Sequence, residues 1–319
     1  MVFSGESVRQ QPGRMAPVSE VRPGSPSPTV TRAIAGAVFR QMREETRDGR
    51  KLSRAEVTKH FRKSDNWLGG VERGEYLPSA RDQADMLRLY GFPERIEFFE
   101  QLRKSTYGRT NWWESELFSA AAPPWLNQLL GLESIAETLS TYDAMVPNGL
   151  FQTEATARAI IRGAEPELAA DEVKKRAALR VARQAAWRGR RGEGEPLIVK
   201  SIIDEAALER PNGGPAVHRE QLLHMADVAE NTENVTILVL PTSVGAHPSM
   251  EGSFKLFRFP EDFGVPGAVY TENRHDSAYY HEPEKIETTD KDLEILTGLA
   301  LDAEQSAKRI RALAKEFYA

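Results

Sequence analysis

The chain has 319 residues and a formal net charge of −5, with 28% charged and 40% hydrophobic residues. These values are typical of a globular protein long enough for two domains. Cysteine is absent, which excludes disulfides, thiolate zinc sites and cysteine catalysis, and no apolar run approaches the roughly 20 residues that span a bilayer. We therefore expect a cytoplasmic protein with no membrane partner, no metal and no cofactor.

The net charge hides an asymmetry along the chain. Residues 1–29 carry a net charge of +1, and residues 30–110 contain 17 Lys and Arg against 12 Asp and Glu, a net charge of +5. Residues 111–319 contain 22 Lys and Arg against 33 Asp and Glu, a net charge of −11. A basic module is therefore joined to an acidic one.

The first elements in chain order are a leader and a helix. Residues 1–29 contain five prolines among Ser, Gly and Arg without apolar periodicity, which predicts a disordered leader. From Thr31 the pattern becomes helical, and Gly49 ends the segment. Its apolar residues recur at spacings of three and four: Ile34, Ala37, Val38 and Met42.

Two short helices with side-chain caps follow. Ser53 is the predicted N-cap of a helix over Arg54–Phe61, and Glu56 is placed to complete a capping box. A second helix is predicted over Ser64–Arg73, with Ser64 as its cap and Gly74 as its stop. With helices expected at Ala80–Tyr90 and Pro93–Tyr107, residues 30–107 form a small all-helical domain.

The two capped helices have the layout of a DNA-binding helix-turn-helix. The helix over Ser53–His60 would cross the phosphates, and the N-terminal end of the helix over Ser64–Arg73 would meet base edges in the major groove. Cations at the turn suit phosphate contacts, Asn66 suits adenine, and Trp67 suits a thymine methyl group. The predicted DNA-binding residues are Arg54, Lys59, Arg62, Lys63, Ser64, Asp65, Asn66 and Trp67.

These residues resemble the Cro/repressor-type (xenobiotic response element, XRE) helix-turn-helix family over about Ala33–Phe92. The resemblance rests on Leu52–Val57 and on Val71–Ser79, where Glu-Arg-Gly precedes Pro-Ser. It implies a λ-repressor-like helical bundle in which Glu72 pairs with Arg43, and in which Gly74 ends the recognition helix.

The chain departs from that family at the end that would read DNA. Arg62 stands at the position of the usual turn glycine, and Gly69 and Gly70 lie inside the recognition helix, at a cost of about 1 kcal/mol each relative to Ala. Asp65 occupies a usual base-contacting position, where its charge would repel phosphate. The base preference therefore stays open.

Residues 112–319 are predicted to form a mixed α+β domain. Helices are expected at Trp112–Glu116, Trp125–Tyr142, Thr153–Arg162, Asp171–Arg188, Val217–Glu230 and Leu301–Phe317. Strands are expected at Leu197–Ile203, Val235–Leu240, Phe254–Phe259 and Ala268–Tyr270. The segment Val146–Phe151 reads as a structural turn.

This larger part resembles the actinobacterial Scr-type, antitoxin-like transcriptional regulators. The resemblance rests on segments spread from the N-terminal domain to the C-terminus, among them Trp112–Glu114, Val146–Glu154, Arg180–Gln184 and Asp204–Leu208. It implies a C-terminal domain of uncharacterised function and a small partner protein encoded by a neighbouring gene.

Two other function classes stay open beside a DNA-binding regulator. An enzyme with an unrecognised active site would use His247, Asp204–Glu205, His275–Asp276 or His281–Glu282, although His-x-x-x-His, Gly-x-Ser-x-Gly and Gly-x-Gly-x-x-Gly patterns are missing. Alternatively, the helical domain contacts proteins, and the chain is a non-DNA-binding scaffold that neutralises a partner. For the regulator we expect a homodimer on double-stranded DNA, because such proteins commonly read two half-sites.

Overall fold

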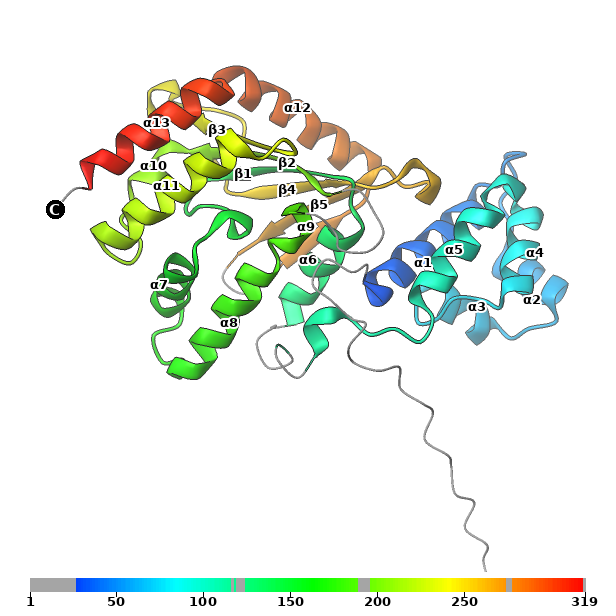
Figure 1. Ribbon diagram of the computed structural model, residues 1–319. Helices are drawn as coiled ribbons and strands as arrows, with labels where there is room; N and C mark the ends of the chain where they lie inside the picture. The colour runs from blue at the N-terminus through cyan, green and yellow to red at the C-terminus, as the bar shows by residue number, and fades with distance from the viewer. Residues whose placement is uncertain (1–26, 116–117, 119–123, 189–195, 274–276, 318–319) are drawn as a thin grey trace, which may run out of the picture.

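The computed structural model describes residues 27–115, 118, 124–188, 196–273 and 277–317. An N-terminal helical region precedes a C-terminal part in which helices cover a six-stranded mixed sheet, as Figure 1 shows. The predicted fold class is confirmed. No helix within the described ranges is both long and apolar enough to cross a membrane.

The N-terminal region packs five α-helices around one small core. They are α1 (Pro28–Glu44), α2 (Arg54–Phe61), α3 (Asp65–Glu72), α4 (Ala80–Tyr90) and α5 (Ile96–Thr106). The largest fully buried side chains of this core are Phe39, Leu68, Met86, Leu87, Tyr90 and Phe99.

The helix α1 begins at Pro28, earlier than the predicted Thr31. Ser27 caps it by accepting a hydrogen bond from the N–H of Val30 (3.2 Å), and Pro28 is favourable in the first turn, where no N–H is needed. Residues 27–29 therefore belong to the folded part. The rest of the predicted leader lies outside the described residues.

The sheet has the order β3-β2-β1-β4-β5-β6. Its strands are β1 (Thr138–Asp143), β2 (Ile198–Asp204), β3 (Val235–Leu240), β4 (Phe254–Arg258), β5 (Gly267–Glu272) and β6 (Ser277–Tyr280). The strands β1, β2 and β3 are parallel, whereas β4, β5 and β6 pair antiparallel with their neighbours. The carboxyl ends of the three parallel strands therefore share one edge with the start of β4.

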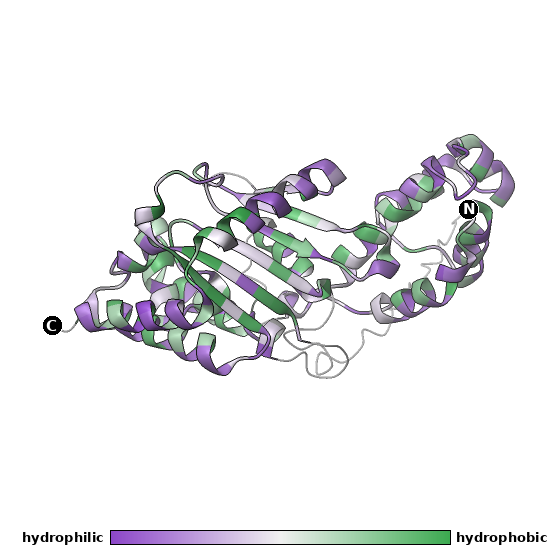
Figure 2. Ribbon diagram, turned by 90° about the horizontal axis from the view of Figure 1, so that it is seen from above, coloured by the Kyte–Doolittle hydropathy of each residue, from purple (hydrophilic) through white to green (hydrophobic). Residues whose placement is uncertain are grey.

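Helices cover both faces of this sheet. They are α6 (Pro124–Ile135), α7 (Glu154–Ala164), α8 (Ala170–Ala182), α9 (Ala185–Arg188), α10 (Glu205–Glu209), α11 (Pro215–Asn231), α12 (Pro283–Leu299) and α13 (Ala303–Glu316). The main core lies between one face and α6, α11 and α13, and α12 packs on the other face. In Figure 2 the central strands are largely hydrophobic, and the helices carry hydrophilic residues along their outer sides.

Two of the predicted helices are wrong in extent. The helix expected over Trp125–Tyr142 ends at Ile135, and β1 follows it as a central strand. The β-branched and aromatic residues of Thr138–Asp143 favour a strand. In the strand, Leu139 and Tyr142 pack on opposite faces of the sheet, so both faces are covered. The helix expected over Asp171–Arg188 is interrupted at Arg183, whose side chain is buried against Glu133.

Other elements agree with the prediction or were missed. The four predicted strands correspond to β2, β3, β4 and β5, whereas the prediction omits β6 and α12. The helix α13, considered above at Leu301–Phe317, contributes Ile310, Leu313 and Ala314 to the main core and contacts α11 and β3. This helix is therefore part of the main core of the sheet domain.

The helix α1 joins the helical region to the sheet. Its Val30 lies in the main core of the sheet domain, and the N–H of Ser27 donates to Ser134 Oγ at 2.8 Å. The helix α6 meets it at Gly131, where a Cβ would lie only 2.0 Å from Cγ2 of Val30. The two parts of the chain are therefore packed against each other along α1.

We predict that Gly131→Ala destabilises the full chain because the new Cβ overlaps the stiff Val30 side chain, by about 1–3 kcal/mol as for other overpacked sites. Urea unfolding measures this change. The control is Gly163→Ala, at an exposed position in α7 with nothing within 4 Å of its Cβ, where alanine stabilises the helix by up to about 1 kcal/mol. Equal behaviour of the two variants would show that the α1–α6 contact is loose.

Candidate nucleic-acid interface

Both helices of the motif start at their predicted caps. The Oγ of Ser53 accepts a hydrogen bond from the N–H of Glu56 (3.2 Å), and the Glu56 carboxylate accepts one from the N–H of Ser53 (2.7 Å). The Oγ of Ser64 accepts from the N–H of Trp67 (3.2 Å). These caps satisfy N–H groups that a helix start leaves unpaired, so the sequence encodes both starts locally.

The turn between α2 and α3 is tight because Arg62 adopts a left-handed backbone conformation, with φ 53° and ψ 43°. It is the sole non-glycine residue with positive φ in the described part of the chain. This conformation costs an L-residue about 1–2 kcal/mol, which explains why glycine is usual here. Phe61 and Trp67 pack across the turn with ring centroids 5.7 Å apart.

A buried ion pair joins α1 to α3. Arg43 Nε donates to Glu72 Oε1 at 2.6 Å, and the two side chains are 6% and 4% exposed. Arg43 Nη1 also donates to the carbonyl of Leu52 at 2.9 Å, just before α2. Burial opposes the charge of Arg43, but the hydrogen bond and charge of Glu72 raise its pKa above the usual value. The pairing that the family resemblance implies is present.

Arg54 connects α2 to the start of α3. Its Nε donates to Asp65 Oδ1 (2.8 Å), its Nη2 to the carbonyl of Asp65 (2.8 Å), and its Nη1 to Glu72 Oε2 (3.4 Å). The hydrogen bond from Arg54 lowers the pKa of Asp65. The charge of Asp65 is thus compensated within the protein, and Arg54 orients α3. A phosphate contact by Arg54 stays a prediction.

The two glycines inside α3 make room for neighbouring side chains. A Cβ on Gly70 would lie 2.6 Å from the Tyr76 ring, whose hydroxyl donates to the carbonyl of Trp67 at 2.8 Å. A Cβ on Gly69 would lie 2.8 Å from the guanidinium groups of both Arg54 and Arg73. These unusual glycines therefore have a packing reason.

The remaining predicted contact residues lie at the turn and at the start of α3. Lys59, Arg62, Ser64 and Asn66 are exposed, and within the described residues neither Lys59 nor Arg62 forms an ion pair. Two cations without an ion-pair partner among the described residues therefore lie beside the polar N-terminal start of α3.

Lys63 and Trp67 are more constrained. Lys63 Nζ lies 3.4 Å from Asp82 Oδ2 and 5.6 Å from the centroid of the Trp67 ring. Trp67 is half-buried between Phe61 and Lys63, whereas Asn66 is exposed.

The structure brings together two candidates of the enzyme hypothesis. The Tyr142 hydroxyl lies 3.1 Å from Asp204 Oδ2 and 3.2 Å from His247 Nε2. Burial and the charge of Asp204 raise the pKa of Tyr142, and the His247 side chain is 5% exposed. Because the tyrosine is harder to ionise and the histidine is covered, this hydrogen-bond chain suits a role in holding the loop before β4.

The other candidates are not assembled with these residues. His281 and Glu282 are exposed at the start of α12, and His275–Asp276 lies outside the described residues. Across the ranges that the structure describes, no three His, Asp or Glu side chains are grouped as metal ligands.

Sequence reasoning missed a buried carboxylate at the end of β1. Asp143 accepts hydrogen bonds from Thr141 Oγ1 (2.6 Å), Ser201 Oγ (3.0 Å) and Asn148 Nδ2 (3.2 Å), and burial raises its pKa. Asn148 also caps the next turn by accepting from the N–H of Leu150. The sequence signal for this site was the Asn-Gly turn at Asn148. We interpreted that turn as structural, but we did not predict that Asn148 would bind Asp143.

Comparison with known families gives two matches. Residues 34–97, from α1 into α5, match the family described as "Helix-turn-helix domain". Residues 126–312, more than half of the chain, match the family described as "Domain of unknown function (DUF5753)". The chain has no match among curated proteins or among solved structures.

We predict that Glu72→Ala lowers the free energy of unfolding by about 3–5 kcal/mol, because it leaves the buried Arg43 guanidinium with Glu44 (3.0 Å), which is 37% exposed, as its remaining carboxylate partner within the described residues. Urea unfolding of the full chain measures the loss. Glu75→Ala is the matched control, since the Glu75–Arg73 pair (2.7 Å) is exposed and its removal costs no more than about 1 kcal/mol. A loss at Glu72 no larger than at Glu75 would contradict the assigned role of the buried pair.

Proposed function

Because the chain belongs to the family of the Domain of unknown function (DUF5753) and carries a helix-turn-helix domain, we propose that it is a sequence-specific DNA-binding transcriptional regulator. The observation that carries the proposal is the exposed turn between two capped short helices, with unpaired cations beside the polar start of α3. A major groove admits such a helix with its N-terminal end toward the bases.

In the proposed complex, α3 enters the groove and α2 faces the backbone. Lys59 and Arg62 meet phosphates, which position the protein without reading sequence. Asn66 reads a base edge, because its exposed amide can make the bidentate contact that adenine offers. Asp65 is tolerated near phosphates because Arg54 already neutralises it.

The acidic sheet domain is the proposed regulatory part. The helix α1 carries Val30 in the core of the sheet domain at one end, and at the other it carries Arg43, which holds Glu72 of α3. A shift of the sheet domain would therefore move α1 and, through Arg43 and Glu72, the recognition helix α3. We further propose a homodimer on two half-sites, because helix-turn-helix regulators commonly bind that way.

The finer identity rests on resemblance. The Cro/repressor-type and Scr-type likenesses support an antitoxin-like, actinobacterial regulator in the cytoplasm, bound to the nucleoid when on DNA. They also support a small partner protein encoded by a neighbouring gene, which would bind the sheet domain.

The salt dependence of DNA affinity tests the assigned docking face. Each lost phosphate contact flattens the plot of log affinity against log salt by about 0.9, so Lys59→Ala and Arg62→Gly each flatten the slope by that amount. Lys308→Ala, on the outer side of α13 and paired with Glu304, leaves the slope unchanged. An unchanged slope for both turn variants would overturn this docking.

Arg62→Gly separates binding from folding. Glycine relieves the left-handed strain of about 1–2 kcal/mol and loses about 1 kcal/mol through its own flexibility, so the free energy of unfolding stays within about 1 kcal/mol. A weaker DNA complex of this variant therefore reports a lost contact.

A DNase footprint upstream of the chain's own gene tests the partner. We predict two protected half-sites about one helical turn apart, and an altered footprint when the product of the neighbouring gene is added. A footprint unaffected by that product at any ratio would contradict the proposed partner. Co-purification with that product in the absence of any footprint at low salt would favour the scaffold instead.

A further inference from the structure

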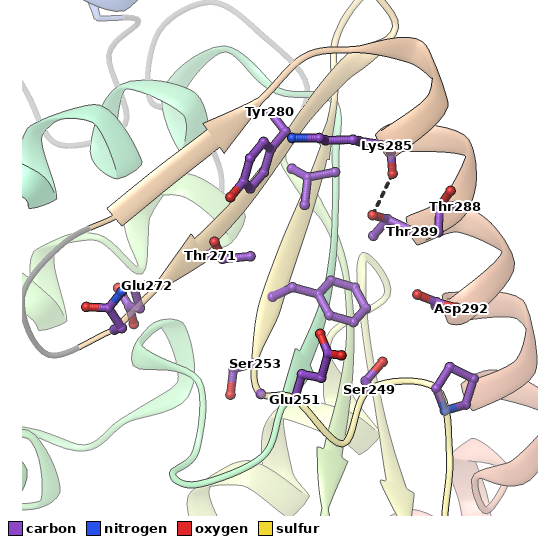
Figure 3. A pocket seen from close by; sticks show the side chains of 15 residues that line it. Ser249, Glu251, Ser253, Thr271, Glu272, Tyr280, Lys285, Thr288, Thr289 and Asp292 are labelled. Atoms are coloured by element: carbon purple, nitrogen blue, oxygen red, sulfur yellow. Dashed lines mark hydrogen bonds between the residues drawn. The ribbon is translucent and has the colours of Figure 1, made fainter.

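A cleft of 540 Å³ opens at the sheet edge where β4 begins, between the loop over residues 248–253, β5 and α12 (Figure 3). Its volume is in the range of small-molecule sites, and α/β sheets commonly bind ligands at the carboxyl ends of their parallel strands. The cleft lies on the face of the sheet that α12 covers, with Phe254 and Val269 as apolar lining. It takes no part in the proposed DNA contact.

The loop that forms one wall is held in place. The N–H of Ser249 donates to His247 Nδ1 at 3.2 Å, and His247 belongs to the buried chain with Tyr142 and Asp204. Ser253 Oγ accepts a hydrogen bond from the N–H of Ala144, after β1, at 2.9 Å. The wall is therefore preformed, which lowers the entropic cost of binding.

One buried hydroxyl in this wall has no partner. Ser249 is 6% exposed, and its Oγ forms no hydrogen bond with any described residue. In Figure 3 this hydroxyl points into the cleft from the loop that also carries Glu251. Buried polar groups are normally satisfied, so this hydroxyl indicates a missing partner inside the cleft.

Four side chains of the lining offer hydrogen-bond acceptors. Thr288 and Thr289 use their hydroxyl protons on the carbonyls of Glu284 and Lys285 (2.8 Å each), and their oxygens keep free lone pairs. The carboxylates of Glu251 and Asp292 form no ion pair within the described residues. A ligand that suits such a lining carries many donors.

The charges around the cleft select the sign of the ligand. Lys285 is the one cation among the lining residues that the structure describes, and its Nζ lies 3.7 Å from the Tyr280 ring centroid. The Glu272 carboxylate is occupied on the other face of the sheet by the Tyr270 hydroxyl (2.5 Å). The cleft thus presents two carboxylates without an ion pair against the one ammonium of Lys285, and this excess of negative charge favours a cation.

We propose that this cleft binds a small organic cation that bears hydroxyl groups, of the amino-sugar class. Its ammonium group meets Glu251 and Asp292, and its hydroxyl groups donate to Ser249, Thr288 and Thr289. Phe254 and Val269 contact the apolar face of the ligand.

The test uses the full chain with glucosamine and galactosamine as cationic probes, and with glucose and galactose as their respective neutral counterparts. Calorimetry and saturation-transfer NMR measure binding. At least one amine binds about tenfold tighter than its neutral counterpart, as expected for one charge-assisted hydrogen bond. If no amine binds more tightly than its counterpart, the proposal is wrong.

Variants place the binding in the cleft. Glu251→Gln and Asp292→Asn each weaken the amine about tenfold, whereas Lys285→Gln strengthens it by removing a like charge. Ser249→Ala weakens binding without lowering the Tm of the free protein, because the lost hydroxyl had no partner. Glu287→Gln, on an exposed pair with Lys291 outside the cleft, changes nothing.

Two outcomes would refute the site. Amine binding that survives both carboxylate variants would place the ligand elsewhere, and weaker binding in Lys285→Gln would indicate an anionic ligand. Should one carboxylate variant fail to fold, the other decides. DNA is absent from these measurements, so they stand or fall independently of the proposed regulator function.

Discussion

The arrangement of the helices α1, α2 and α3 depends on the buried guanidinium of Arg43. This group holds Glu72 at the end of α3 and the carbonyl of Leu52 at the entrance to α2. A buried charge has few alternative partners, so the pair defines one arrangement of three helices rather than several. Arg54 continues the network outward to Asp65, and this explains how an acidic residue is accommodated at the start of a helix that would enter DNA.

The same helix α1 that carries Arg43 is anchored in the sheet domain by Ser27 and Val30. A 17-residue helix spans about 25 Å, which is long enough to connect the two cores as one stiff element. In the proposed regulator, a change in the acidic domain would reach the helix-turn-helix through α1. The cleft beside α12 and the turn between α2 and α3 lie on different parts of the molecule.

What the sequence predicted well was local. The caps Ser53 and Ser64 act on their own helices, and the strands β2 to β5 are short runs rich in apolar, β-branched and aromatic residues. What it missed depends on distant partners: β1 is a strand because β2 and β4 flank it, and Arg183 interrupts a helix beside the buried Glu133. The reasons for Gly69 and Gly70 lie in Tyr76, Arg54 and Arg73, and the cleft needs three segments that meet only in the fold.

The central claim is that the exposed start of α3 reads DNA sequence. Selection of duplexes from a random pool by the full chain, at near-physiological salt, tests it most directly when the Asn66→Ala variant is run in parallel. The account predicts an enriched motif for the native chain, with a position at which adenine is preferred and at which the variant loses that preference. A native chain that enriches no motif, or a motif unchanged by Asn66→Ala, would contradict the assignment of α3 as the recognition helix.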